Sequence, residues 1–550
     1  MTLRVLIVGG YGTFGGRLVR LLACDARFAL LVAGRSLERA RAFCEGVAAQ
    51  ARLEPVRFDR DAPLDAQLAT LTPDVVVDAS GPFQAYGAAP YALVEACIAR
   101  SIHYLDFADA TAFVDGATAF DAAAKAKDVV VLSGVSSFPA LSTAVLQRLG
   151  KGLSQMDVAA GIAPSPHAGI GRNVIRMIAS TAGKRIAGHG FAMMVHRRVV
   201  IAPPGVVPLR PRRFSLVDAP DLVLVPQHWP SVRSVWTSAG TAPPVWQRLL
   251  GLLSWLVRLR VLPSLSFLAP LFHRVGNRLS WGAHRGGMFV TVRGITASGE
   301  HVARDWHMIA EGDDGPFIPA MATAALLRKW VEGALPALGA RPCIGDVTLE
   351  EYEHLFARFR ITTGVRETTP QRVPLYRRYL GSAWAGLPDA IRDMHDGDGV
   401  WRAEGRAKVE RGRGPIARIA AFVFGFPKAG DDVPVSVTFT AADGRETWTR
   451  NFAGKAFSSV QYEGRGRRDG LICEAFGPFV FAMALVPDGG RLRLVQCGWS
   501  AFGIPLPMFL APVGDTFESA EEGRFHFHVE IGFPWTGLIV RYRGWLSRQP

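Results

Sequence analysis

The chain has 550 residues, of which 49% are hydrophobic and 20% are charged, so it is long enough for two or three folded domains and is not a disordered protein. Its net charge of +14 comes from Lys and Arg spread along the whole chain, and no zinc-finger or RNP pattern points to nucleic acid. Six scattered cysteines without a CxxC pair argue against a cysteine metal site and fit a reducing compartment. A cleaved signal peptide is not expected, because a buried strand begins at Leu3, and we therefore expect a cytoplasmic protein.

The first predicted element is a buried strand, Leu3–Val8, that leads into a glycine-rich turn and then into an apolar helix, Arg17–Leu22. In this context Gly-x-Gly-x-x-Gly predicts a dinucleotide site, because the glycines permit the tight turn, a close pyrophosphate and the packing of helix on strand. The free N–H groups and the dipole at the helix start also favour phosphate. The turn residues that we predict to bind the cofactor are Gly9, Gly10, Gly12, Thr13, Phe14 and Gly15.

The second predicted strand, Phe28–Ala33, indicates which dinucleotide is bound. It ends in Gly34-Arg35-Ser36, where an NAD site carries an Asp or Glu for the ribose 2′-hydroxyl. A guanidinium at Arg35 would pair with a 2′-phosphate, which a carboxylate would repel. We therefore predict NADP(H) as the cofactor, held by Arg35 and Ser36; the alternative is that Arg35 is an ordinary surface arginine.

Strand and helix alternate as far as residue 136, which predicts a doubly wound Rossmann sheet. The third strand ends at Asp59, which we expect at the adenine edge. The fourth, Asp74–Asp78, is a valine run typical of a parallel strand buried on both faces. Ligands bind at the carboxyl edge of such sheets, so the residues that follow this strand are further cofactor candidates: Ala79, Ser80 and Gly81.

Residues 137–362 mix strands with Pro- and Gly-rich loops, which predicts an inserted α+β domain for substrate binding or dimerisation. An apolar helix at 317–331 is expected to return to the Rossmann sheet. Within the insert, residues 246–261 form an apolar, Trp-bearing helix flanked by arginines and too short to span a membrane. Packing against another domain or against the second subunit of a homodimer is favoured for this helix; peripheral contact with a membrane surface and a lid over an apolar substrate are the alternatives.

A linker is expected near 362–370, followed by a helix over Leu375–Met394 that is interrupted at Pro388, and then by a β-rich domain, 374–550 in all. Turn signals there separate at least six antiparallel strands, which predicts a curved sheet or barrel. The six candidate strands are Val433–Ala441, Glu446–Phe452, Phe479–Leu485, Leu492–Cys497, Arg524–Ile531 and Gly537–Tyr542. Four phenylalanines share one face of two strands and would suit an internal apolar pocket, although a plain packed core is favoured: Phe479, Phe481, Phe525 and Phe527. On the opposite face, His526-x-His528-x-Glu530 is interpreted as a solvated polar face, and no metal site is predicted.

Several motifs between residues 1 and 360 together resemble the saccharopine dehydrogenase-like NADP-binding family: the glycine turn, Ala33-Gly34-Arg35-Ser36, Asp78-Ala79-Ser80-Gly81-Pro82-Phe83, His103-Tyr104-Leu105-Asp106 and Gly134–Pro139. Residues from 374 onward resemble the DUF4166 domain through Trp448-x-Arg450-x-Phe452, Glu474–Pro478, Pro505–Pro507 and Tyr542–Leu546. The first resemblance implies a Rossmann domain that holds NADP(H), with Ser80 and Gly81 near the nicotinamide-side ribose. It does not imply saccharopine as the substrate.

The predicted function is NADP(H)-dependent transfer of hydride to or from a small or lipid-like carbonyl, imine or enoyl compound. The alternative is a nonenzymatic NADP(H)-binding scaffold or redox sensor whose C-terminal domain binds a lipid or a partner. No Tyr-x-x-x-Lys pair lies beside the cofactor turns, so the catalytic proton donor is not identified. His167, Arg172 and Lys184 are candidates by position alone.

Overall fold

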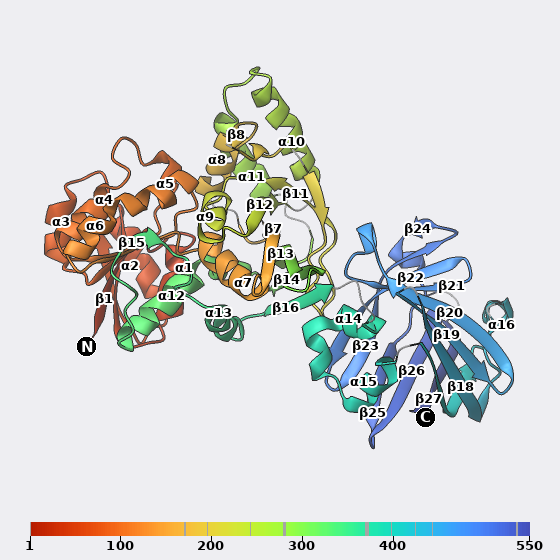
Figure 1. The fold of residues 1–550 in the computed structure, drawn as a ribbon. Helices are drawn as coiled ribbons and strands as arrows, with labels where there is room; N and C mark the ends of the chain where they lie inside the picture. Colours follow the sequence, from red (N-terminus) through yellow and green to blue (C-terminus); the bar gives the residue numbers. More distant parts are fainter. Residues whose placement is uncertain are drawn as a thin grey trace. The chain divides into compact units, whose positions relative to one another are not determined.

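The structure is a computed structural model of the whole chain (Figure 1). It describes residues 2–549 except 170–171, 187, 195, 242–243, 279–281, 369–372, 398, 424, 443 and 535–536. The chain divides into two compact units: the first comprises Met1–Val199, Arg212–His301 and Ile309–Ile361, and the second comprises Val200–Pro211, Val302–Met308 and Thr362–Pro550.

The first unit begins with a seven-stranded sheet in the order β15-β6-β5-β4-β1-β2-β3, with all its neighbouring strands parallel. Its strands are β1 (Leu3–Val8), β2 (Phe28–Gly34), β3 (Arg52–Arg57), β4 (Val75–Asp78), β5 (His103–Asp106), β6 (Val130–Ser133) and β15 (Gly339–Pro342). The valine run of β4 is buried throughout, as a strand covered on both faces requires. The strand order reverses between β1 and β4, and this point is where ligands bind in open parallel sheets.

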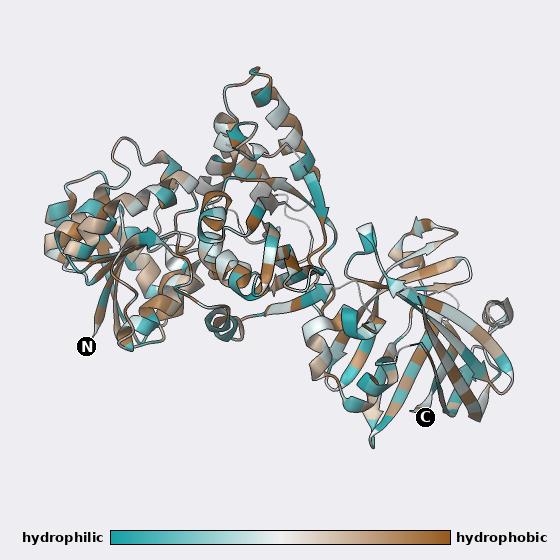
Figure 2. Cartoon of the chain, viewed as in Figure 1, coloured by the Kyte–Doolittle hydropathy of each residue, from teal (hydrophilic) through white to brown (hydrophobic). Residues whose placement is uncertain are grey.

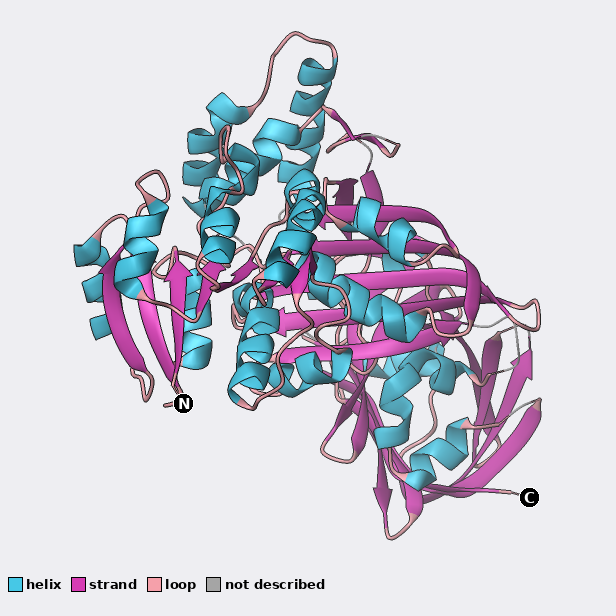
Figure 3. Ribbon diagram, turned by 60° about the vertical axis from the view of Figure 1, so that its left-hand side comes forward, coloured by secondary structure: helices cyan, strands magenta, loops and turns pink. Residues whose placement is uncertain are grey.

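Helices lie on both faces of this sheet (Figure 3). Leu68, Leu93 and Ala124, from α3, α4 and α6, pack with Leu6 and Val8 of β1 in one apolar core. On α12, the Arg328 side chain donates to the carbonyl oxygen of Leu21 in α1 at 2.6 Å. The helices around the sheet are α1 (Gly15–Leu22), α2 (Leu37–Glu45), α3 (Leu64–Leu71), α4 (Ala92–Ala99), α5 (Thr111–Gly116), α6 (Asp121–Ala126), α12 (Ile318–Val331) and α13 (Leu349–Phe356), and α7 (Ser142–Leu149) packs against the sheet that follows.

A second seven-stranded sheet follows in the order β10-β11-β12-β7-β13-β14-β16. It is mixed, because β7 pairs in parallel with β12 and antiparallel with β13. Its strands are β7 (Leu153–Ala163), β10 (His196–Val199), β11 (Arg212–Leu216), β12 (Val232–Gly240), β13 (Arg285–Thr296), β14 (His301–Glu311) and β16 (Ile361–Thr368), and its helices are α8 (Arg172–Thr181), α9 (Asp221–His228), α10 (Pro244–Arg258) and α11 (Ala269–Arg278). The prediction of a linker near 362–370 was wrong in part, because the described residues up to Thr368 belong to strand β16 of this sheet.

The second unit holds an eleven-stranded antiparallel sheet that closes on itself through the pairing of β22 with β23. Apolar and polar residues alternate along its strands (Figure 2), as expected when one face lines the interior. The strands are β17 (Val400–Arg411), β18 (Gly430–Ala442), β19 (Arg445–Phe452), β20 (Lys455–Glu463), β21 (Ile472–Phe476), β22 (Phe479–Asp488), β23 (Arg491–Ala501), β24 (Ile504–Leu506), β25 (Thr516–Glu521), β26 (Arg524–Phe533) and β27 (Gly537–Arg548). The predicted fold class, a Rossmann sheet with an α+β insert and an antiparallel β-rich domain, is confirmed.

The helix expected over Leu375–Met394 is broken into α14 (Leu375–Leu380), a short 3-10 turn and α15 (Asp389–His395). The break comes at Gly381, whose φ of +48° is left-handed, and not first at Pro388. The closed sheet also corrects the expectation of a plain packed core. It encloses a cavity of about 670 Å³, and all four of the phenylalanines named above line it.

Candidate functional site

The glycine turn after β1 leaves no space for side chains on three of its glycines. Gly9 has a φ of +79°, and a Cβ there would lie 2.9 Å from the carbonyl oxygen of Ala79, which follows β4. A Cβ on Gly15 would overlap the carbonyl oxygen of Gly9, and one on Gly10 would lie 2.8 Å from the carbonyl oxygen of Ile7. Glycine is therefore required for the turn to close, and the turns after β1 and β4 touch each other at the switch point.

Helix α1 starts at the end of this turn with an open N-terminus. Phe14 is its N-cap residue and makes no side-chain capping hydrogen bond, and the first turn contains no acidic residue. Gly12 is exposed beside it. A pyrophosphate is the kind of group that such a helix start binds, since the leading N–H groups and the dipole both favour an anion.

The end of β2 brings Tyr11 against Gly34, and this contact leaves no space for a side chain at Gly34. The Tyr11 hydroxyl accepts a hydrogen bond from the backbone N–H of Ser36 at 3.1 Å, and the Arg39 guanidinium lies 5.1 Å from the Tyr11 ring centre. Arg35 is exposed, and no ion pair or hydrogen bond of its side chain occurs among the described residues. The residue directly after Gly34 is thus Arg35, where an NAD site carries a carboxylate, and Arg39 lies one helical turn further on.

The Ser36 and Asp59 side chains both have local structural roles. The Ser36 hydroxyl caps α2 by accepting from the backbone N–H of Arg39 at 3.3 Å. Asp59 uses one carboxylate oxygen to accept from the backbone N–H of Asp61 at 3.2 Å, and its own backbone pairs twice with the Gln67 side chain. These bonds fix both residues at the carboxyl edge of the sheet.

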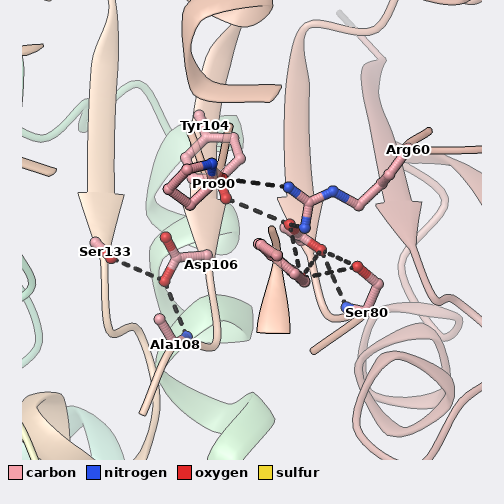
Figure 4. A network of polar contacts seen from close by, with 9 residues as sticks. Arg60, Ser80, Pro90, Tyr104, Asp106, Ala108 and Ser133 are labelled. Atoms are coloured by element: carbon pink, nitrogen blue, oxygen red, sulfur yellow. Dashed lines mark hydrogen bonds and ion pairs between the residues drawn. The ribbon is translucent and has the colours of Figure 1, made fainter. Parts of the chain in front are cut away.

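A buried carboxylate at the end of β4 organises the second turn (Figure 4). Asp78 is fully buried and forms an ion pair with Arg60 at 3.0 Å. It also accepts from the backbone N–H of Ser80 at 3.0 Å and from the Ser80 hydroxyl at 2.6 Å. The Tyr86 hydroxyl lies 3.0 Å from that of Ser80 and 3.2 Å from Asp78, and the Arg60 guanidinium stacks on the Tyr86 ring at 3.4 Å.

These contacts keep the two hydroxyls protonated and hold them in place. Burial, followed by the negative charge of Asp78, raises the pKa of Tyr86 far above its ordinary value. Burial lowers the pKa of Arg60, but Asp78, Tyr86 and Tyr104 together more than offset this effect and leave the pKa raised. Ser80 and Tyr86 therefore present neutral hydroxyls of fixed orientation beside the glycine turn.

Asp106, at the end of β5, is a second buried carboxylate with a free oxygen. One oxygen accepts from the backbone N–H groups of Gly134 at 2.8 Å and Ala108 at 2.9 Å, and from the Ser133 hydroxyl at 3.1 Å. The other oxygen has no hydrogen-bond partner among the described residues. Burial raises the pKa of Asp106 to about 7, although the three hydrogen bonds oppose the shift.

Asp106→Asn is expected to remove part of the pH dependence of stability. The folded state of the natural protein holds this proton up to about pH 7, whereas the unfolded chain releases it near pH 4, so its free energy of unfolding falls as the pH rises between these values. Asn keeps the accepting oxygen and never ionises. The free energy of unfolding of the variant, relative to that of the natural protein, should therefore increase as the pH rises from about 4 to about 8, by on the order of 4 kcal/mol. Denaturant unfolding at both pH values measures this, with the exposed Asp61→Asn as control; a gain that is the same at both would contradict the assignment.

Two imidazoles lie together in the loops that follow β7 and precede β13, beside the loop after β14. The His167 ring stacks on the His284 ring at 3.8 Å, and His284 Nδ1 lies 2.5 Å from a carboxylate oxygen of Asp313. The Ser165 hydroxyl donates to the other oxygen of Asp313 at 2.9 Å. Of the three residues considered by position, only His167 joins such a cluster: Lys184 is exposed, and the Arg172 side chain lies outside the described residues.

Helix α10 exposes an apolar face. Leu252, Trp255 and Leu259 are 66%, 51% and 65% exposed, and Phe267 and Leu271 add to the same stretch. The opposite face, with Leu250, Leu253 and Val257, packs inside the first unit. No helix among the described residues has both the length and the apolar character needed to cross a membrane.

Sequence reasoning missed Arg60, His284 and Asp313 as parts of these clusters. None of them belongs to a local motif, and each reaches its partners only through tertiary contacts with residues far along the chain. The described residues contain no group of three or more His, Cys, Asp or Glu side chains arranged to hold a metal ion.

Comparison with known proteins identifies two domains. Residues 5–132 match the family described as Saccharopine dehydrogenase NADP binding domain, and residues 387–546 match Domain of unknown function (DUF4166). Both matches confirm the predicted resemblances, the first over a shorter stretch than expected. The match to the NADP-binding domain supports an NADP-linked oxidoreductase. No curated protein matches the chain significantly in sequence.

Solved structures resemble the chain only distantly. Apo saccharopine dehydrogenase (L-Glu forming) from Saccharomyces cerevisiae is 14% identical, with a TM-score of 0.45 over 67% of this chain and 100% of its own. A dehydrogenase (MviM) from Clostridium difficile is 9% identical, with a TM-score of 0.30 over 65% and 98%. Rv2717c from M. tuberculosis is 14% identical, with a TM-score of 0.19 over 30% and 99%. It is the two family matches that place the chain: its N-terminal domain is similar to the saccharopine dehydrogenase NADP-binding domain, and its C-terminal domain is similar to DUF4166.

Proposed function

We propose that the protein transfers hydride between NADP(H) and a small or lipid-like carbonyl, imine or enoyl compound. The observation that carries this proposal is the open helix start after the glycine turn, together with Arg35 at the end of β2, where an NAD site carries a carboxylate. The groups present fit the cofactor, which would supply or accept the hydride. The remaining work of the chain is to hold the cofactor and to orient the substrate.

Each predicted site residue has a proposed role. The glycine turn would hold the pyrophosphate, Arg35 and Ser36 the 2′-phosphate, and Asp59 the adenine edge. Ala79, Ser80 and Gly81 would lie along the nicotinamide-side ribose, with the neutral Ser80 and Tyr86 hydroxyls fixed by Asp78. The pair of His167 and His284 beside Asp313 is the group in the insert best suited to supply a proton.

Turnover with NADPH tests the enzymatic function. Full-length protein is mixed with NADPH and a panel of enoyl, keto and imino compounds of short and long chain, and absorbance at the nicotinamide band is followed. Oxidation of NADPH with one class supports the proposal. Tight binding of NADPH without turnover on any class would support the alternative, a nonenzymatic scaffold or redox sensor.

We also propose that the exposed face of α10 rests on an anionic membrane surface. No Asp or Glu occurs between Asp221 and Glu300, whereas Arg248, Arg258 and Arg260 flank the exposed leucines and tryptophan. An apolar helix face bordered only by cations matches the interface of a bilayer that contains anionic lipid.

Replacing Leu252 and Trp255 together by Glu is expected to lower binding to phosphatidylserine-containing vesicles by at least about tenfold, because the change removes apolar burial and adds repulsion. Co-sedimentation with the vesicles at low and high salt measures it. The control is Leu335→Glu at an exposed leucine elsewhere in the first unit, which is 49% exposed. If the natural protein stays in the supernatant and light scattering shows a dimer that the double variant abolishes, the face is a subunit interface and the membrane proposal is wrong.

A further inference from the structure

The cavity inside the closed sheet of the second unit is large enough for a ligand. Its volume of about 670 Å³ lies within the roughly 300–1,000 Å³ of small-molecule sites. Aromatic rings supply much of its wall, among them Phe439, Phe481 and Phe527. Met508 and Val513 line the cavity and are also 44% and 49% exposed, so they mark its opening.

One buried polar side chain in this wall has unused hydrogen-bonding groups. Gln461 on β20 is 1% exposed and lines the cavity. Among the described residues, the hydrogen-bonding neighbour of its amide is the Tyr376 hydroxyl, and this one contact leaves further N–H and oxygen positions of the amide unused. Such groups are nearly always satisfied in native proteins, so Gln461 points to a bound molecule that donates or accepts a hydrogen bond.

The charged side chains around Gln461 are already paired, and carboxylates prevail among them. Arg450 donates to Glu474 at 3.1 Å and to Ser459 at 2.8 Å, and Glu518 lies 2.8 Å from His395 Nε2. A third carboxylate, Glu446, is buried behind Trp448 and accepts its indole N–H at 3.2 Å.

The other cation in the wall, Arg493, lies 3.4 Å from Asp515 and 3.8 Å from Asp488. An anionic ligand would therefore find no unpaired cation in the described part of the wall, and it would be repelled by the carboxylates.

We propose that this cavity binds an uncharged, largely apolar molecule that carries a hydroxyl or carbonyl group, with that group hydrogen-bonded to Gln461. Long-chain alcohols, ketones and similar neutral lipids have this chemistry, and fatty acids in their ionised form do not. The proposal is independent of the hydride-transfer function, because it rests only on the cavity in the second unit.

Displacement of Nile red, a neutral fluorescent probe, from the full-length protein tests the proposal. We expect 1-dodecanol and 2-dodecanone to displace the probe at concentrations at least about tenfold lower than dodecanoate above neutral pH. Equal or tighter binding of dodecanoate would overturn the assignment of a neutral ligand. Failure of the natural protein to bind the probe or the alcohol would mean that the cavity holds only water or is closed.

Two variants locate the site. Gln461→Leu is expected to weaken 1-dodecanol about tenfold while the probe binds as before, whereas the exposed Gln549→Leu should change neither. Unchanged alcohol binding in Gln461→Leu would overturn the role of Gln461. Leu494→Trp, which fills the cavity, should abolish binding of both the probe and the alcohol, and binding that persists would place the ligand elsewhere. Thermal melting of each variant checks that it is folded.

Discussion

Gly12→Val is expected to weaken NADPH binding by at least about 100-fold without unfolding the protein. Gly12 is exposed beside the start of α1, and a Cβ there would lie 3.0 Å from the Gly9 carbonyl oxygen, so the turn can accept it with a small adjustment. The two added methyl groups would occupy the space that the pyrophosphate needs. Fluorescence titration with NADPH measures the affinity, and the melting temperature is expected to change by only a few degrees, as for an exposed substitution.

Gly15→Ala is expected to impair folding as well as cofactor binding, in contrast to Gly12→Val. Its single Cβ would overlap the backbone of Gly9, so this smaller substitution is expected to lower both the affinity for NADPH and the melting temperature. Gly46→Ala in the same domain is the control, since its Cβ would meet nothing closer than 3.6 Å. Unchanged NADPH affinity in folded Gly12→Val would show that the cofactor does not use this turn.

Arg35→Asp is expected to reverse the preference between the two nicotinamide cofactors. A charge-assisted hydrogen bond to the 2′-phosphate contributes about 1.5–3 kcal/mol, and a carboxylate replaces it by repulsion while it accepts from a ribose 2′-hydroxyl. The dissociation constant for NADPH should rise by about 10- to 100-fold and that for NADH should fall. Isothermal titration with both cofactors measures the change.

The matched control is Arg41→Asp, which makes the same charge change at an exposed position within α2, the helix that follows Arg35. It should lower NADPH affinity far less than Arg35→Asp does. If both variants lower it equally, the effect is a general one of net charge, and Arg35 does not contact the 2′-phosphate.

Much of the fold could be predicted from the sequence, because the Rossmann strands are short apolar runs with glycine turns at their ends. In the second unit, the six predicted strands correspond to β18, β19, β22, β23, β26 and β27. β17 was missed because Arg402, Glu404 and Arg406 alternate with small residues, so its inward face carries little hydrophobic signal. β15 was missed because it pairs Gly-Ala-Arg-Pro with β6, and only the tertiary structure provides that neighbour.

Local motifs predicted the candidate cofactor residues but not the contacts that hold them. The glycine turn and Arg35 stand in sequence patterns whose spacing is set by one strand and one helix. The Arg60–Asp78 ion pair joins the segment after β3 to the end of β4, and its significance follows only from burial. The sequence favoured a packed core over an internal pocket, because four aromatic residues on two strands are compatible with either one. Only the closure of the sheet, through the pairing of β22 with β23, shows that they line a cavity.

The equilibrium affinity of the unmodified full-length protein for NADPH and for NADH, measured side by side at one salt concentration, is the most direct test of the central claim. The claim is that the turn after β1 and the arginine after β2 form an NADP(H) site. We predict saturable binding of one NADPH per chain, at least about tenfold tighter than NADH. Binding of NADH as tight as that of NADPH, or no binding of either, would contradict it.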